Sequence, residues 1–215
     1  MRKPDWFQDW SDRPVVIVAS GPSAFDVNLD VARGRVRVVA LNSSYRLCPW
    51  ADMVYGCDAK WWISENGLPD FHGLKVSGQP RPAEMYQDIR HVNVLATDDR
   101  FTMDPLGTVG SGGNSGFQAL NLVAQFGARQ IILVGYDIRI DLGLHWHGSH
   151  CVGLNNPNER LMFRWRRGLD HAASALAGLG VEVLNASPVS ALTAYEKIHF
   201  EEAVQRWCGT PASVQ

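Results

Sequence analysis

The segment from residue 107 to residue 138 limits the possible folds of this chain more than any other part of the sequence. It runs from a glycine-rich loop, through an apolar helical pattern that stops at Gly127, into the apolar run IILV. Glycines leave backbone N–H groups uncovered, and a polar residue before the helix can cap its start. Because free N–H groups at a helix start attract anions, the segment predicts a phosphate site. The residues of this predicted phosphate site are Gly112, Gly113, Asn114, Ser115 and Gly116.

Apolar runs alternate with helical patterns along the rest of the chain, which is typical of a parallel sheet with helices on both faces. We expect strands at residues 15–19, 37–41, 53–55, 74–77, 91–95, 131–134 and 181–184. Helices are expected at residues 59–65, just after Pro82, at 116–126 and at 158–179. The fold class predicted is α/β: a Rossmann-like, doubly wound, mainly parallel sheet in a single domain. The predicted boundaries are an N-terminal arm at 1–13, the main domain at 14–207 and a C-terminal tail at 208–215.

Composition excludes several other classes of protein. The formal net charge of −2 provides no global basic field for nucleic acid, and the arginines at 160–167 fit a solvated helix face. Four cysteines without CxxC spacing predict neither a disulfide framework nor a structural zinc site. The N-terminus lacks the apolar stretch of a signal peptide, and no window approaches the ~18 apolar residues of a membrane span. We therefore expect a cytoplasmic protein with no membrane partner, and leave a homo-oligomer open.

Polar residues stop four of the apolar runs at their carboxyl ends. In a doubly wound sheet these ends meet at one edge, where ligands bind, so the placement predicts a nucleotide there. The first of these loops repeats the order strand, tight turn, helix. The residues are Gly21, Pro22 and Ser23 after the first run, Asn42 after the second, Asp58 after the third and Asp137 after IILV. Each of them could equally be a turn residue or a helix cap.

Three histidines follow in the spacing H-x-H-x-x-H. Imidazole is the usual general base near neutral pH, so His147 and His150 are candidate catalytic residues, together with Asp137. A zinc site and a purely structural loop are the alternatives, and we assign no metal ligands. The candidate substrate contacts are His145, Trp146, Asn185 and Ser187.

These motifs together resemble a known family. The strand-GPS, LNSSY and GCD segments, the SGGNSGFQAL helix, IILVGYD and the downstream HGSH resemble the sialyltransferases of glycosyltransferase family 42, over about residues 14–195. The HWHG…GLNNP stretch is similar to related phage-encoded proteins of unassigned role. The GPS loop and the helix–strand–G-x-D pattern also resemble the archaeal type of 6-hydroxymethylpterin diphosphokinase.

The resemblance to the sialyltransferases implies a CMP-sugar donor and a histidine that acts as base on the acceptor hydroxyl. That histidine corresponds to His150, or to His147 if the loop is shifted. The family's nucleotide contacts correspond to Ser23 and Asn42, and its helix start to Ser115 and the glycine after it. The paired tyrosines that the family uses on the leaving phosphate have no clear match in this chain.

Three functions are compatible with these residues. The first is a transferase that takes a nucleotide-sugar, with the phosphates on loops 20–23 and 111–116 and a histidine of 145–150 as base. Its acceptor would be a small molecule or glycan, or, in a phage setting within a host cytoplasm, a modified DNA base. The second is diphosphoryl transfer from ATP to a small hydroxymethyl compound, with Mg²⁺ held by Asp58 or Asp137. The third is a non-catalytic nucleotide-binding module.

Overall fold

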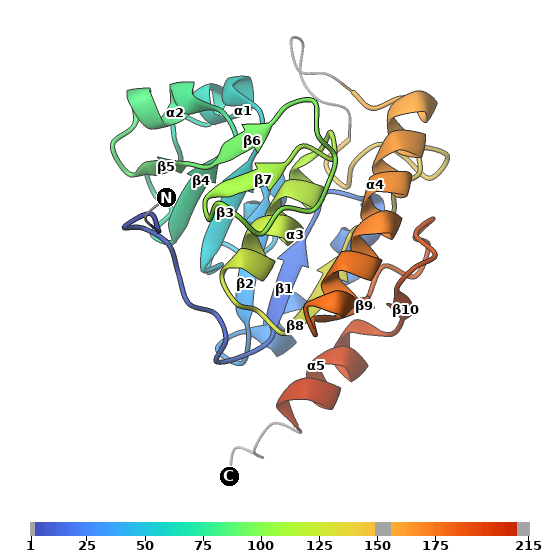
Figure 1. Cartoon of the computed structure of the whole chain (residues 1–215). Coiled ribbons are helices and arrows are strands. Elements are labelled where there is room, and N and C mark those ends of the chain that lie inside the picture. The colour runs from blue at the N-terminus through green and yellow to red at the C-terminus, as the bar shows by residue number, and fades with distance from the viewer. Residues whose placement is uncertain (1–2, 149–155, 210–215) are drawn as a thin grey trace.

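The fold is built on a main sheet of eight parallel strands, shown in Figure 1, in a computed structural model that describes residues 3–148 and 156–209. The order across the sheet is β10-β9-β8-β1-β2-β3-β4-β5, so the chain starts in the middle and winds outward in both directions. The strands of this sheet are β1 Val15–Val18, β2 Arg37–Leu41, β3 Met53–Gly56, β4 Leu74–Ser77, β5 Ile89–His91, β8 Gln130–Val134, β9 Glu182–Asn185 and β10 Glu196–Lys197. This order confirms the predicted doubly wound α/β fold.

The central strand fixes the register of the sheet. Ile17 in β1 pairs with Val39 in β2 on one side and with Leu133 in β8 on the other. All three side chains are fully buried, as a strand covered on both faces requires. Their apolar runs are therefore continuous, with no polar residue at alternate positions.

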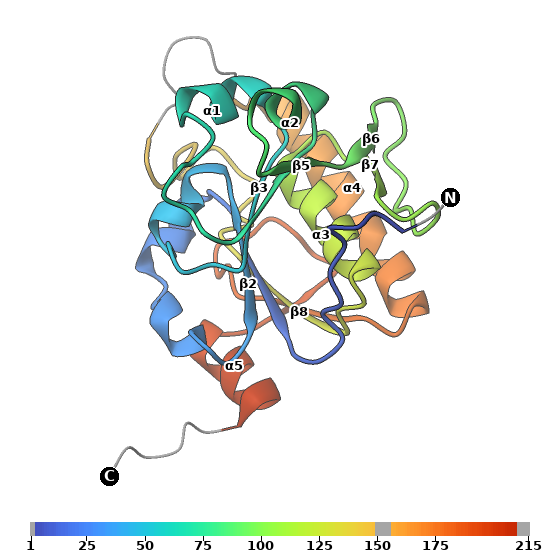
Figure 2. The same ribbon diagram turned by 90° about the vertical axis from the view of Figure 1, so that its left-hand side faces the viewer.

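Helices cover both faces of the sheet, as Figures 1 and 2 show. On one face, α3 packs against β1 and α4 packs against α3 and β9, in one core with Val15 and Ile17. On the other, α1, α5 and the short 3-10 turns η1 and η2 pack against Val16 and Val18. The helical elements are η1 Pro22–Asp26, η2 Leu29–Ala32, η3 Asn42–Arg46, α1 Ala59–Ser64, α2 Pro80–Met85, α3 Ser115–Gln125, α4 Glu159–Gly178 and α5 Phe200–Cys208. Because successive side chains of β1 point to opposite faces, the strand contributes residues to two separate cores.

Four local expectations need correction. The loop after β1 forms the 3-10 turns η1 and η2 in place of an α-helix. The strand expected at 91–95 is split, because β5 ends at His91 and β6 Asn93–Leu95 pairs with β7 Thr108–Gly110 in a second, two-stranded sheet. The glycine-rich loop was not expected to begin as a strand. The elements β10 and α5 were not expected either. β10 pairs with β9 as an edge strand of the sheet, and α5 packs in the core on one face.

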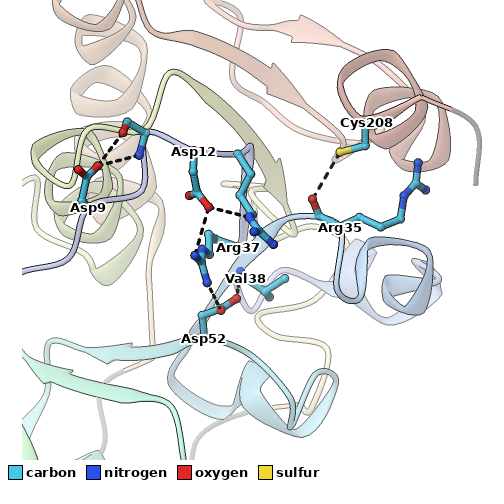
Figure 3. A network of polar contacts seen from close by, with 9 residues as sticks. Asp9, Asp12, Arg35, Arg37, Val38, Asp52 and Cys208 are labelled. Atoms are coloured by element: carbon cyan, nitrogen blue, oxygen red, sulfur yellow. Dashed lines mark hydrogen bonds and ion pairs between the residues drawn. The ribbon is translucent and has the colours of Figure 1, made fainter.

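The N-terminal arm belongs to the domain rather than standing apart from it. Phe7 and Trp10 are buried, and their rings meet Phe126 edge-on at 4.7 and 5.0 Å between centroids. Figure 3 shows a polar network that ties the arm to β2: Arg37 binds Asp12 of the arm and Asp52 before β3. The arm expected at residues 1–13 therefore contributes two rings to the packed core.

The C-terminal helix is fastened to the same end of the sheet. The Cys208 thiol donates to the carbonyl of Arg35 at 3.7 Å, a contact drawn in Figure 3. The Arg35 guanidinium also binds the carbonyl of Gly209. Cys208, placed in the tail by the sequence, is therefore the last residue of α5, while 210–215 lie outside the described residues.

Candidate functional site

A pocket of about 200 Å³ lies at the carboxyl edge of the sheet, where β1, β2, β3 and β8 end. Ligands of open α/β sheets bind at this edge, where the strand order reverses. The loop ends Ser20 and Gly21 form one part of its wall, and the start of α3 forms another. Predicted site residues in the lining are Gly21, Asn42, Asp58, Gly113, Asn114, Ser115, Gly116, Asp137 and His145. The structure thus brings nine residues from five separate loops together.

The start of α3 lines this pocket. Asn114 caps the helix, with its Oδ1 accepting from the Phe117 N–H at 2.8 Å. The N–H groups of Ser115 and Gly116, at the first two helical positions, have no intrahelical acceptor because of their place in the helix. The Ser115 hydroxyl oxygen accepts from the Cys57 N–H at 3.1 Å and so joins the helix start to the end of β3. The pocket therefore holds the positive end of an 11-residue helix.

Two of the glycines in the loop are required by packing rather than by a ligand. A Cβ on Gly112 would lie 2.1 Å from the Phe117 ring. A Cβ on Gly113 would point at α4, 3.1 Å from Trp165 Nε1, and its φ of +72° disfavours any other residue. The Phe117 ring covers Gly112. A ligand at the helix start would therefore meet Gly113 and the residues after it, which line the pocket.

Asp137 serves as a clamp between two strand ends. It is 1% exposed, its Oδ2 accepts from the Ser23 N–H at 2.9 Å, and its Oδ1 accepts from the Ser23 hydroxyl. Gly21 lies so close to this clamp that an added Cβ would be 2.7 Å from the Asp137 Cγ and 2.4 Å from the Gly135 carbonyl oxygen. Pro22 and Ser23 face a neighbouring pocket beside α5, so of the GPS residues Gly21 lines the main one.

Asn42 enters the pocket with a strained backbone. Its φ is +48°, in the left-handed region, and Ile138, a β-branched residue on the opposite wall, has the same φ. Such outliers cluster at functional sites because the surrounding fold must hold them. Asn42 Nδ2 donates to Ser115 Oγ at 3.4 Å, while its buried Oδ1 has no hydrogen-bond partner among the residues the structure describes. This acceptor is available to a donor group of a ligand.

Asp58 and Cys57 follow β3 and complete this side of the pocket. Asp58 caps α1, with Oδ1 accepting from the Lys60 N–H at 2.8 Å. The helix-cap role that the sequence left open is therefore present, together with a place in the pocket lining. Burial raises the pKa of the Cys57 thiol, so it stays protonated near neutral pH.

One of the three histidines lines the described part of the pocket. His145 does so, and its Nδ1 lies 2.9 Å from the Ser20 hydroxyl. His147 stacks on it with ring centroids 5.1 Å apart and planes 12° apart. Trp146 turns to the other side, where its indole donates to Ser44 Oγ at 3.3 Å and its ring stacks on Phe25. His150 lies outside the described residues.

Asn185 and Ser187 are placed inside the fold rather than at the pocket. Both are 0% exposed. Ser187 Oγ accepts from the Tyr136 N–H at 2.8 Å, and Asn185 Oδ1 accepts from the Ser187 N–H at 3.0 Å. The two side chains brace the ends of β8 and β9, and we remove them from the set of substrate contacts.

The sequence did not reveal the wall that α4 contributes. Met162 and Trp165 line the pocket, and Trp165 Nε1 is buried without a partner within the described ranges 3–148 and 156–209. Met162, Trp165 and Leu169 are spaced by three and four residues, which puts them on one helix face. That spacing was the available signal. The pocket therefore offers an unpaired donor on α4 and an unpaired acceptor on Asn42.

Two absences hold for the described residues. Across 3–148 and 156–209, no three or more His, Cys, Asp or Glu side chains gather in a way that could hold a metal ion. Within the same ranges, no helix is long and apolar enough to cross a membrane.

Comparisons with known proteins give a match in structure. No family model matches the sequence, and no curated protein does. The sialyltransferase CstII from Campylobacter jejuni, solved with cytidine-5'-monophosphate, matches with a TM-score of 0.55 and 10% identity, over 88% of this chain and 86% of that chain. A point variant of the α-2,3/8-sialyltransferase CstII matches at 0.52 and 11%, over 86% of each chain. CstII with a trisaccharide acceptor and CMP matches at 0.50 and 11%, over 86% of this chain and 85% of that chain. These structures share the fold of the present chain.

Proposed function

We propose that this protein transfers a sugar from a nucleotide-sugar donor, most simply a CMP-sugar, to a hydroxyl group of an acceptor. The observation that carries the proposal is the pocket itself, in which the N-terminus of α3 and the strained Asn42 meet at the carboxyl edge of the sheet. Support comes from the shared fold of CstII, which has been solved with CMP and with a trisaccharide acceptor. The sequence resemblance, argued from separate motifs, points to the same chemistry.

In this proposal the donor phosphate lies at the start of α3. The N–H groups of Ser115 and Gly116 stabilise its charge, and they gain importance as the phosphate leaves with the bonding electrons. Asn42 Oδ1 and Trp165 Nε1 are the buried groups that would meet the nucleoside part of the donor. Asp58, which follows β3 and lines the pocket, would bind a ribose hydroxyl.

The acceptor hydroxyl is deprotonated by a histidine of the 145–148 segment or by His150. His145 is our first choice, because it lines the pocket and its ring is oriented by Ser20. The acceptor oxygen then bonds to the sugar carbon, the bond from that carbon to the phosphate oxygen breaks, and the nucleotide leaves with its phosphate. His147 would act through the stacked ring of His145. A modified DNA base as acceptor and a phage origin stay predictions from the resemblance.

The diphosphokinase alternative has less support. Its Mg²⁺ would need Asp58 or Asp137, and both oxygens of Asp137 already accept hydrogen bonds from Ser23. A metal at Asp137 would therefore have to share oxygens that already bind Ser23. Activity that needs ATP and Mg²⁺, with none on CMP-sugars, would select this alternative.

Calorimetric titration tests the proposal. CMP should bind at least roughly tenfold more tightly than cytidine, because only CMP carries the group that the helix start attracts. Asn42→Ala should weaken CMP binding by roughly tenfold, the effect of about 1.4 kcal/mol. Asn66→Ala is the matched control. Asn66 has a similar φ of +50°, but it is exposed and does not line the pocket. Equal affinity for CMP and cytidine, or equal effects of the two variants, would remove the basis for the proposal.

A further inference from the structure

A groove of about 370 Å³ extends the pocket along α4. Two residues, Arg139 and Met162, line both the pocket and the groove, so a ligand in one can be joined to a ligand in the other. The groove is formed by the loop after β8 and by the first two turns of α4. Its other lining residues are Ile140, Asp141, Glu159, Phe163 and Arg166.

The groove walls present both donors and acceptors of hydrogen bonds. Arg139 is fixed, with Nε on Asp141 Oδ1 at 2.7 Å and Nη1 on the Val189 carbonyl at 3.2 Å. Arg166 is less engaged: its Nη2 lies 3.5 Å from the Ile138 carbonyl, and its buried Nε has no partner within the described parts of the chain. Glu159, in the first turn of α4, adds a second carboxylate beside Asp141. The charges are balanced, so the groove does not select an anion.

One of the residues that line the groove is an aromatic ring that faces water. Phe163 is 66% exposed, although it follows Met162, which is 6% exposed. Because α4 turns about 100° per residue, Phe163 cannot join the row of Met162 and Leu169 against the sheet. A groove that is lined by an exposed phenyl ring and also by guanidinium and carboxylate groups is suited to a ligand with one apolar face and a polar rim.

We propose that this groove is the binding site for a neutral pyranose ring of the acceptor. A pyranose has a face of C–H groups, which stacks on an aromatic ring, and a rim of hydroxyls, which donate to carboxylates and accept from guanidinium groups. Phe163 provides the platform, and Arg166 and Glu159 hold the rim. The sugar then lies next to the proposed donor pocket, at the side shared through Arg139. The inference rests on the proposed function, since it assigns the acceptor of that same reaction.

The test uses two phenylalanines of almost equal exposure. Phe163→Ala removes the platform, and Phe25→Ala is the matched control, because Phe25 is 65% exposed and lines neither the pocket nor the groove. Wild type and both variants are applied, with saturating CMP, to an array of neutral mono- to tetrasaccharides. Saturation-transfer NMR on the strongest binder then gives the affinity. A second pair, Arg166→Gln against the exposed Arg160→Gln, tests the rim in the same way.

We expect the wild type to bind a subset of pyranosides. Phe163→Ala and Arg166→Gln should each weaken binding by roughly tenfold, whereas the two controls keep it. Binding of CMP should be the same in all five proteins. Two results would show that the groove is not the acceptor site: CMP binds but no sugar does, or Phe163→Ala binds sugars as well as Phe25→Ala does. Either result leaves the proposed donor unaffected. If sugars bind through Phe163 and CMP does not bind, the groove survives and the proposed donor fails.

Discussion

Replacing Ser23 with alanine should lower the free energy of unfolding by about 1.5–3 kcal/mol. The change removes the hydroxyl that donates to Asp137 Oδ1 and leaves one oxygen of a carboxylate that is 1% exposed without that partner. A hydrogen bond to a charged group contributes about this much, and the loss is largest where water cannot replace it. In a chain of this size each 1 kcal/mol shifts Tm by about 2–4 °C, so 2 kcal/mol corresponds to about 4–8 °C.

Asp137→Ala extends the same argument. It also removes the acceptor of the Ser23 N–H, so two bonds are lost and the destabilisation should reach about 3–6 kcal/mol. In the Asp137→Ala background, Ser23→Ala should have little further effect, because its partner is already gone. The coupling energy of this double-mutant cycle should therefore equal most of the Ser23→Ala effect. Urea titrations followed by tryptophan fluorescence provide all four free energies.

The chain contains its own control for this prediction. Ser11 makes the same pair of contacts, backbone N–H and hydroxyl, to Asp9, but both residues are exposed. Ser11→Ala should therefore leave stability nearly unchanged, since water takes over the contacts. The clamp interpretation of Asp137 is refuted if Ser23→Ala destabilises no more than Ser11→Ala.

Further predictions concern the arm, the thiols and an ion pair. Trp10→Ala should destabilise the whole domain by about 3–5 kcal/mol in urea, because the ring is 3% exposed; a separate early transition would instead show that the arm folds apart. Cys57 lines the pocket, so CMP should slow its alkylation by iodoacetamide as followed by mass spectrometry. Burial raises the pKa of Cys48 to about 12, and it should react only on unfolding. The Arg164 guanidinium lowers the pKa of Asp99 below 3.8, so the stabilisation from this partly exposed pair, up to about 1 kcal/mol, is present above pH 3.8. The stability difference between wild type and Arg164→Ala should then vanish as the pH falls through the lowered value.

The sheet could be predicted because its strands are buried on both faces. In β1 and β8 the runs VVIV and IILV contain no polar residue, and such runs fit only the middle of a parallel sheet. The edges were harder. The short strand β10, with the exposed residues Glu196 and Lys197, has no apolar pattern, and its pairing depends on the position of β9. The 3-10 turns after β1 were read as a helix because Pro22 and Ser23 are also common at helix starts.

The site could be predicted only as a list of candidates. A polar residue after a strand is placed at the sheet edge, but the sequence does not say whether it faces the ligand or the interior. Asn42, which follows β2, lines the pocket, whereas Asn185, the last residue of β9, is fully buried and accepts from the Ser187 N–H. Trp165 was missed because its contact with the loop at Gly113 joins residues about fifty positions apart. The spacing of Met162, Trp165 and Leu169 gives the inward face of α4, but the loop that this face contacts follows only from how α4 packs.

A crystal structure with CMP tests the central claim most directly. The account predicts the phosphate oxygens at hydrogen-bond distance, about 2.7–3.2 Å, from the N–H groups of Ser115 and Gly116. It also predicts that Asn42 Oδ1 accepts a hydrogen bond from the nucleoside. A phosphate bound elsewhere, or a pocket that stays empty at millimolar CMP while the protein remains folded, would contradict the account.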